Sequence, residues 1–82
     1  MIMVDVEVQS IGRKYNFALE EQVPISVLIS EIREVISQKE NCFLGKPENE
    51  LTLSSLENGV MMSPDLSLSE YGVMNGHTLL LT

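Results

Sequence analysis

The fold is most clearly indicated by LSLSEYGVMNGHTLLLT, residues 66–82. It ends in an apolar strand, HTLLLT, whose side chains alternate between two faces. Leu79 and Leu81 lie on one face, and Thr78, Leu80 and Thr82 lie on the other. Asn75-Gly76 separates this strand from another apolar run, which is the usual signal for a tight β-hairpin. The preceding LSLSEYGV does not alternate as a strand does, and it predicts a turn-rich connection with a 3₁₀ turn.

The amino-terminal residues predict a β-hairpin. IMVDVEVQ (2–9) alternates strictly, as a half-buried strand does, with the isoleucine and the valines on one face and Met3, Asp5 and Glu7 on the other. Gly12 marks the turn. YNFALEE (15–21) then alternates again, with an apolar face made by Tyr15, Phe17 and Leu19.

A helix follows Pro24, a residue favoured at helix starts because its missing N–H is not needed there. The next apolar residues recur at steps of three and four and fall within a stripe about 120° wide, which is typical of a core-facing helix. The residues of this stripe are Ile25, Leu28, Ile29, Ile32, Val35 and Ile36. Val27 interrupts the polar side. We expect the helix to end near Asn41.

The second half of the chain predicts short strands. Residues 41–50 form a loop, 51–56 a strand, 57–59 a turn and 60–62 a returning strand. The order β-β-α-β-β-β then describes a two-layer α+β domain, with a mixed sheet of four or five strands packed on one helix. The last strand is so apolar that we expect it to be central and parallel to the first.

Composition limits the possible functions. The chain has 82 residues, which predict one domain over residues 1–82. Its net charge of −7 and its scattered basic residues argue against binding nucleic acid or an anionic membrane surface. The single cysteine, Cys42, cannot form an internal disulfide. We find no signal peptide and no membrane span in the sequence, and we therefore expect a cytoplasmic protein.

The sequence offers little for catalysis. Cys42 and His77 are the only cysteine and histidine, and they fall in separate predicted loops, so they predict neither a nucleophilic dyad nor a metal site. Glu48 and Glu50 lack the spacing of a calcium loop. Glycine-rich nucleotide motifs are absent from the sequence. We expect no enzymatic activity, no cofactor and no metal.

The C-terminal motif carries a resemblance. Five residues match the ubiquitin-type pattern of Leu-Ser-Asp-Tyr, an apolar residue, a tight loop and Thr-Leu-x-Leu: Leu68, Tyr71, Val73, Leu79 and Leu81. With the order of elements, this resembles the ubiquitin-like β-grasp fold. Through VPISVLISEI (23–32) and residues 66–81, the chain is most similar to the YukD/EsaB-type proteins of Gram-positive type VII (WXG100, ESX-like) secretion systems. The resemblance implies that Asn75-Gly76 leads into the central strand and does not close a hairpin.

The resemblance also implies a function. Ubiquitin and the sulfur carriers of its fold act through a flexible tail ending in Gly-Gly, whereas this sequence stops at Thr82, so we expect neither conjugation nor sulfur transfer. The implied role is a non-conjugated adaptor or regulatory protein bound to cytoplasmic parts of a secretion membrane complex, which would bring it to the membrane through its partners. Two alternatives stay open: a modifier or sulfur carrier whose tail is missing from this chain, and the soluble ubiquitin-like domain of a larger membrane protein.

Several surfaces are candidates for binding. Ubiquitin receptors mostly contact an apolar patch on the outer sheet face, where Leu80 would lie with Thr52 or Ser54 beside it. Leu80 and Met3 together predict a smaller patch on that face. Val27 and three methionines, Met61, Met62 and Met74, are further candidates, because flexible methionines adapt to partners. The interaction residues we predict are Leu80, Met74, Met3 and Val27. An exposed edge strand could also pair with a partner or with a second copy, as a homodimer.

Overall fold

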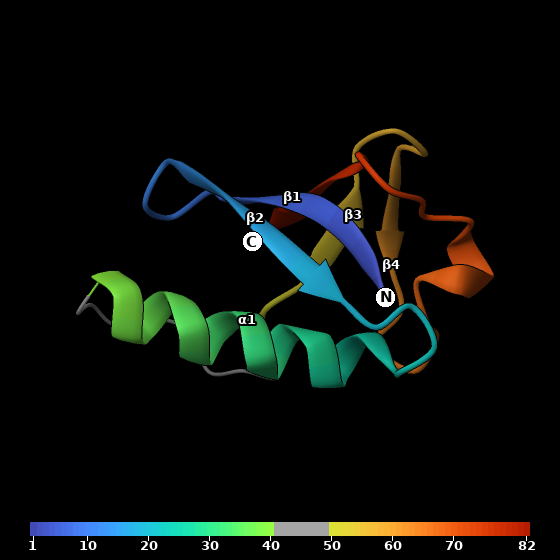
Figure 1. Cartoon of the computed structure of the whole chain (residues 1–82), viewed down its shortest axis with the longest axis horizontal. Helices are drawn as coiled ribbons and strands as arrows, with labels where there is room; N and C mark the ends of the chain where they lie inside the picture. The colour runs from blue at the N-terminus through green and yellow to red at the C-terminus, as the bar shows by residue number, and fades with distance from the viewer. Residues whose placement is uncertain (41–49) are drawn as a thin grey trace.

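The computed structural model describes residues 1–40 and 50–82. Figure 1 shows a twisted sheet lying across a single long helix. The elements in chain order are β1 (Ile2–Val8), β2 (Arg13–Leu19), α1 (Ile25–Glu40), β3 (Leu53–Ser55), β4 (Val60–Met62), the 3₁₀ turn η2 (Ser69–Tyr71) and β5 (Thr78–Leu81). This is the predicted order β-β-α-β-β-β, and it confirms the two-layer α+β fold.

The sheet has five strands in the order β2-β1-β5-β3-β4. β5 lies at its centre, parallel to β1 and antiparallel to β3. The last strand of the chain therefore occupies the predicted central position. Leu79 and Leu81 are 0% and 1% exposed on its inner face, as the alternation in HTLLLT predicts.

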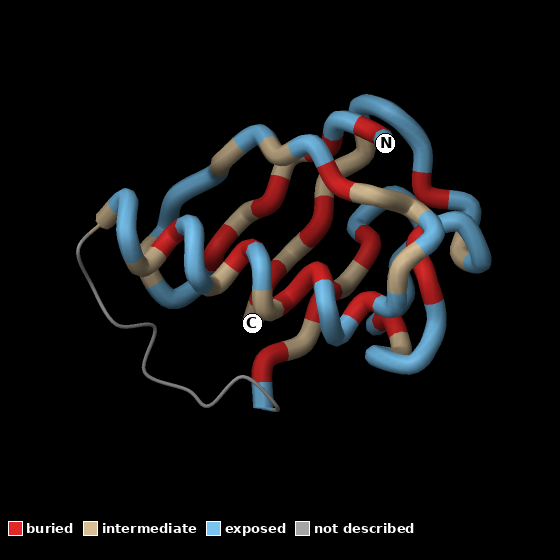
Figure 2. The backbone as a smooth tube through the Cα atoms, turned by 60° about the horizontal axis from the view of Figure 1, so that its bottom comes forward, coloured by how far each residue is buried: buried red, intermediate tan, exposed pale blue. Residues whose placement is uncertain are grey.

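The core lies between the inner face of the sheet and α1. Figure 2 shows the buried segments gathered where these two layers face each other, with the turns exposed. All four inward residues of β1 are buried, and so are five residues of the helix stripe: Ile25, Leu28, Ile29, Ile32 and Ile36. Val35 was predicted to belong to this stripe, and that prediction is wrong, because its side chain is 44% exposed. At 100° per residue Val35 lies about 20° beyond Leu28, at the rim of the stripe, where the sheet does not cover it.

The start of α1 is capped by backbone from a distant segment. The N–H of Ile25 donates to the carbonyl of Leu66 at 2.8 Å, and the N–H of Ser26 donates to that of Pro64 at 3.0 Å. These contacts satisfy two of the donors that every helix start leaves without an internal partner. The helix begins one residue after Pro24, whose carbonyl accepts the N–H of Val27. Its expected end near Asn41 falls at the edge of the described residues.

Asn75-Gly76 forms the turn that leads into β5. Gly76 has φ +86°, a left-handed conformation that suits glycine. The Met3 N–H donates to Oδ1 of Asn75 at 2.8 Å, and the Gly76 N–H donates to the Met3 carbonyl at 2.9 Å. The turn therefore docks on β1 and aligns β5 beside it. The prediction that Asn75-Gly76 does not close a hairpin is confirmed.

Some predictions concern residues 41–49, which lie outside the described part of the chain. They include the loop assignment of residues 41–49 and every statement about Cys42 and Glu48. The glycine turns at Gly12 and Gly59 are described, and both have positive φ as expected for tight turns.

Candidate functional site

The outer face of the sheet is the face that α1 does not cover. Pairing registers place five outward side chains side by side in one row across all five strands: Lys14, Glu7, Leu80, Ser54 and Met61. Ser54, rather than Thr52, is therefore the third-strand neighbour of Leu80. Thr52 lies two residues away, where its hydroxyl bonds that of Thr82 at 2.7 Å.

Three apolar side chains surround Ser54, and we call them the outer patch: Leu56, Met61 and Leu80. Leu80 and Met61 flank Ser54 in the row across the sheet. Leu56 follows two residues after Ser54, and its N–H donates to the Thr78 carbonyl at 3.1 Å. Met61 is 70% exposed and Leu56 48% exposed, whereas Leu80 is half-buried. Leu56 was not predicted from the sequence, because its place beside Leu80 depends on a register between distant strands.

Acidic side chains border the outer patch. Glu7 lies opposite Leu80, and Asp5 lies opposite Thr78. Oε1 of Glu57 accepts the Thr78 N–H at 2.8 Å. This bond lowers the pKa of the Glu57 carboxyl below its ordinary value, because the N–H stabilises the ionised form. The outer patch is therefore an apolar surface with negative charge on the sides of β1 and the β3–β4 turn, and it suits a partner that is apolar and basic.

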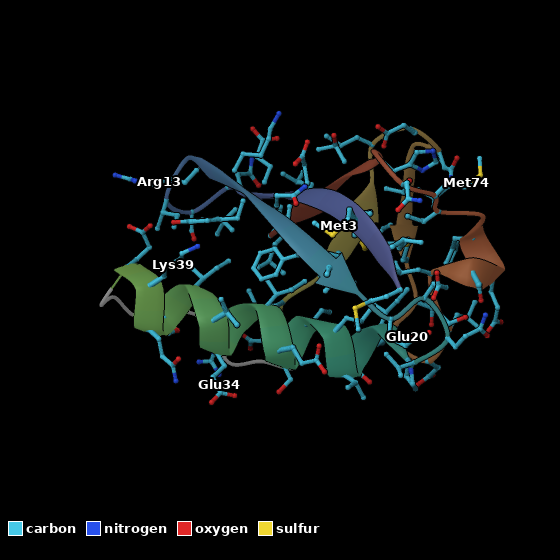
Figure 3. The ribbon with its side chains drawn as sticks, viewed as in Figure 1. Met3, Arg13, Glu20, Glu34, Lys39 and Met74 are labelled. Carbon is cyan, nitrogen blue, oxygen red and sulfur yellow. The ribbon has the colours of Figure 1, made fainter. Side chains whose placement is uncertain are left out.

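The predicted interaction residues do not share one surface. Met3 and Leu80 both lie on the outer face, but Leu80 pairs with Glu7, four residues or about 13 Å from Met3 along β1. They do not form the joint patch predicted from the sequence. Met3 and Met74 instead flank the Asn75-Gly76 turn, and Figure 3 shows Met74 pointing away from the body of the molecule. Val27 is 44% exposed on the opposite layer, in α1.

One of the methionines is not a surface residue. Met62 is 3% exposed and belongs to the core, so its prediction as adaptable surface is wrong. In β4, Met61 points outward while Met62 points towards α1, because successive side chains of a strand lie on opposite faces.

The residues of the C-terminal motif stabilise the fold. Leu68, Val73, Leu79 and Leu81 are all buried. The Tyr71 hydroxyl accepts the Ser63 N–H at 2.8 Å, and the Tyr71 carbonyl accepts the side-chain amide of Asn58 at 2.8 Å. The motif thus holds η2, the β3–β4 turn and β5 together.

The described part of the chain has few groups that could catalyse a reaction or bind a metal ion. In residues 1–40 and 50–82, no group of three or more His, Cys, Asp or Glu could hold a metal ion. Nδ1 of His77 accepts the Met74 N–H at 3.3 Å and so stabilises the turn before β5. Among residues 1–40 and 50–82, no helix has both the length and the apolar character that a membrane span requires.

Comparison with known proteins gives one family. The family model described as "WXG100 protein secretion system (Wss), protein YukD" matches residues 3–81. No curated protein sequence matches the chain.

Solved structures give the same fold. The ubiquitin-like domain of an Arabidopsis thaliana protein matches with a TM-score of 0.72 and 22% identity, over 99% of this chain and 74% of that one. A de novo design based on ubiquitin matches with a TM-score of 0.68 and 22% identity, over 99% and 85% of the two chains. A further N-terminal ubiquitin-like domain matches with a TM-score of 0.71 and 21% identity, over 99% and 72%. These likenesses establish the ubiquitin-like β-grasp fold.

Proposed function

Because the chain belongs to the YukD family of the WXG100 protein secretion system, we propose that it acts there as an adaptor or regulatory protein through noncovalent binding. The observation that carries this proposal is the family match over residues 3–81. The protein is a ubiquitin-like component associated with secretion, and its partners in this proposal are the cytoplasmic parts of the secretion membrane complex. It would reach the membrane through them from the cytoplasm.

The outer patch is the surface we assign to this role. Leu80 lies in β5, Met61 in β4 and Leu56 in the turn directly after β3, and the three expose apolar area next to the carboxylates of Glu7 and Glu57. Apolar contact supplies most of the affinity of such a surface, and the carboxylates select partners that carry basic residues. Binding rather than catalysis fits this arrangement, since the outer patch holds no nucleophile or base paired with a second catalytic group.

Met3, Met74 and Val27 remain candidate contacts of a different kind. Met3 and Met74 lie at the Asn75-Gly76 turn, and Val27 lies on the helix layer. A partner that covers the outer patch would not reach Val27 on the opposite layer. Val27 is therefore the natural control for the outer patch.

The test is a pull-down of the tagged protein from its native cells in mild detergent, with mass spectrometry of the captured proteins. We expect the wild-type protein to recover a polytopic membrane protein or an FtsK-type ATPase of the secretion system. Met61→Lys should remove that recovery, because it replaces apolar contact with a charge that repels a basic partner. Val27→Lys makes an equal change on the opposite layer and should leave recovery intact.

Other results would contradict parts of the proposal. Recovery of an adenylating enzyme, or of the protein itself as a covalent adduct of higher mass, would overturn the noncovalent role. Loss of the secretion component with Val27→Lys and not with Met61→Lys would place the contact on the helix layer. Thermal melting of both variants should match the wild type, since both positions are exposed.

A further inference from the structure

β2 lies at one edge of the sheet and pairs only with β1 among the described strands (Figure 1). It has seven residues, from Arg13 to Leu19, whereas β4 at the other edge has three, from Val60 to Met62. A long exposed edge presents backbone groups that can pair with another strand. β2 is therefore the edge on which strand addition would give the larger interface.

The register identifies which backbone groups of β2 point outward. The Asp5 N–H donates to the His77 carbonyl, and the Gln9 N–H, just after β1, donates to the Leu81 carbonyl, so both groups point towards β5. The backbone N–H and C=O groups of the residues that alternate with these in β1 therefore point towards β2. Their partners in β2 are Arg13, Tyr15, Phe17 and Leu19. Antiparallel geometry then directs the backbone N–H and C=O of Lys14, Asn16 and Ala18 away from β1. All three residues are exposed.

The charges along this edge are distributed so that they would complement those of the same edge in a second copy. Arg13 and Lys14 lie at the start of β2, and Glu20 and Glu21 follow its end (Figure 3 labels Arg13 and Glu20). Lys14 is exposed, and Glu20 keeps 43% of its side chain exposed with the amino terminus at 3.7 Å. Two copies of the edge laid antiparallel would bring the basic start of each beside the acidic end of the other.

We propose that two copies of this chain associate through β2, antiparallel and related by a two-fold axis, in the register that places Phe17 opposite Phe17 of the second copy. This register pairs Asn16 with Ala18 of the second copy, so that the outward backbone groups bond each other. It also places Lys14 opposite Glu20 of the second copy, twice by symmetry. The result is a continuous ten-stranded sheet with the two helices on one side.

Phe17 lies at the centre of this edge and favours contact with a second copy there. Its ring is half-buried on the helix side, 6.5 Å from that of Tyr15 in an edge-to-face arrangement. In the proposed register the two Phe17 residues form a non-hydrogen-bonded pair, the kind with the closer side chains. Aromatic cross-strand pairs at such positions stabilise sheets. The contact would therefore cover apolar area that each copy leaves partly exposed.

The net negative charge of each copy opposes this association, whereas the two Lys14–Glu20 pairs favour it. Variants that change the net charge in opposite directions can therefore test the pairs separately from the net charge. Each copy has a net charge of −7. Lys14→Glu makes this charge more negative and Glu20→Lys makes it less negative, yet both variants turn two attractive pairs into two repulsive ones. The double variant restores the pairs with reversed polarity at the original net charge.

Sedimentation velocity over micromolar to millimolar concentrations measures the dimer constant. We expect the wild-type protein to shift from its 9.2 kDa monomer towards twice that mass. Each single variant should weaken the dimer about tenfold, and the double variant should restore it, because exposed ion pairs contribute modestly and repulsions cost a similar amount. An equimolar mixture of the two single variants should form a heterodimer, in which both pairs are attractive.

Glu31→Lys is the matched control, since it makes the same charge change as Glu20→Lys on the exposed side of α1. It should leave the dimer constant unchanged or slightly tighter. A monomer at every concentration would overturn the proposal. So would a dimer that both single variants leave unchanged, or a double variant as weak as the singles. Thermal melts of all variants check that each one is folded.

Discussion

The two faces of β5 differ in burial although they share one backbone. Leu79 and Leu81 are 0% and 1% exposed against α1, whereas Thr78 and Leu80 are half-buried on the outer face. The inner residues belong to the motif that matches ubiquitin-like proteins. The outer residues lie between acidic side chains of β1 and the β3–β4 hairpin.

Such a strand allows a small domain to keep its fold while its outer surface changes. Alternation along a strand directs each neighbouring residue to the opposite face. A substitution at Leu80 changes the outer surface, while one at Leu79 changes the core. If this division holds, stability should depend on the inner residues and binding on the outer ones.

The largest effect should come from a charge placed in the inner layer. Leu28→Asp or Ile32→Asp puts an unpaired carboxylate into a fully buried position. This costs several kcal/mol out of a total stability of about 5–10 kcal/mol, so either variant should be unfolded. Thermal melting followed by circular dichroism measures this. Val27→Asp, on the exposed side of the same helix, should keep a transition close to that of the wild type.

A melt of Leu28→Asp or Ile32→Asp that stayed sharp and close to the wild-type temperature would show that the helix face is assigned wrongly.

A smaller effect on stability should distinguish the inner face of β5 from its outer face. Leu79→Ala removes a fully buried side chain and should lower the free energy of unfolding by about 2–5 kcal/mol. Leu80→Ala should lower it by about 1 kcal/mol or less, because part of that side chain is already in water. Chemical denaturation of both variants gives the two values. Equal losses would mean that the outer face is as important for folding as the inner one.

The smallest effect should be the pH dependence of stability that arises from Glu57, at the border of the outer patch. The Thr78 N–H lowers the pKa of Glu57 in the folded protein below its ordinary value of 4.5. The unfolded chain therefore binds the proton more readily, so this contribution to stability is present above pH 4.5 and is lost as the pH falls through the lower folded pKa.

Melting temperatures measured between neutral and acid pH test this sign. Glu57→Gln should flatten the fall in melting temperature below pH 4.5, while Glu31→Gln controls for the loss of one negative charge. A wild-type protein and a Glu57→Gln variant with the same acid dependence would show that the Thr78 bond has no effect on stability.

Much of the fold was predictable because it depends on local patterns. Strict alternation identified the inner face of β1, and steps of three and four identified α1 with its five buried residues. The apolar character of HTLLLT placed β5 at the centre of the sheet. These predictions hold because periodicity and burial are linked residue by residue along each element.

The errors concern residues whose burial depends on distant neighbours. Val35 has the apolar spacing of the stripe but lies at its rim, where the sheet does not reach. Met62 has the same side chain as Met61, and only the pairing of β4 with β3 determines which of the two points inward. The expected patch of Met3 and Leu80 was also wrong, since the β1–β5 register separates the two residues along the sheet.

Local sequence patterns were enough to predict the order of the elements, the apolar faces of β1, α1 and β5, and the similarity to the YukD family. The folded sheet was needed to show which outer residues meet: Leu56, Met61 and Leu80 come together only through the registers of β3 with β4 and β5. The capping of α1 by the carbonyls of Pro64 and Leu66 likewise depends on tertiary contacts. The physical reason is that periodicity depends on neighbours in the chain, whereas register depends on the hydrogen bonds and packing of the whole sheet.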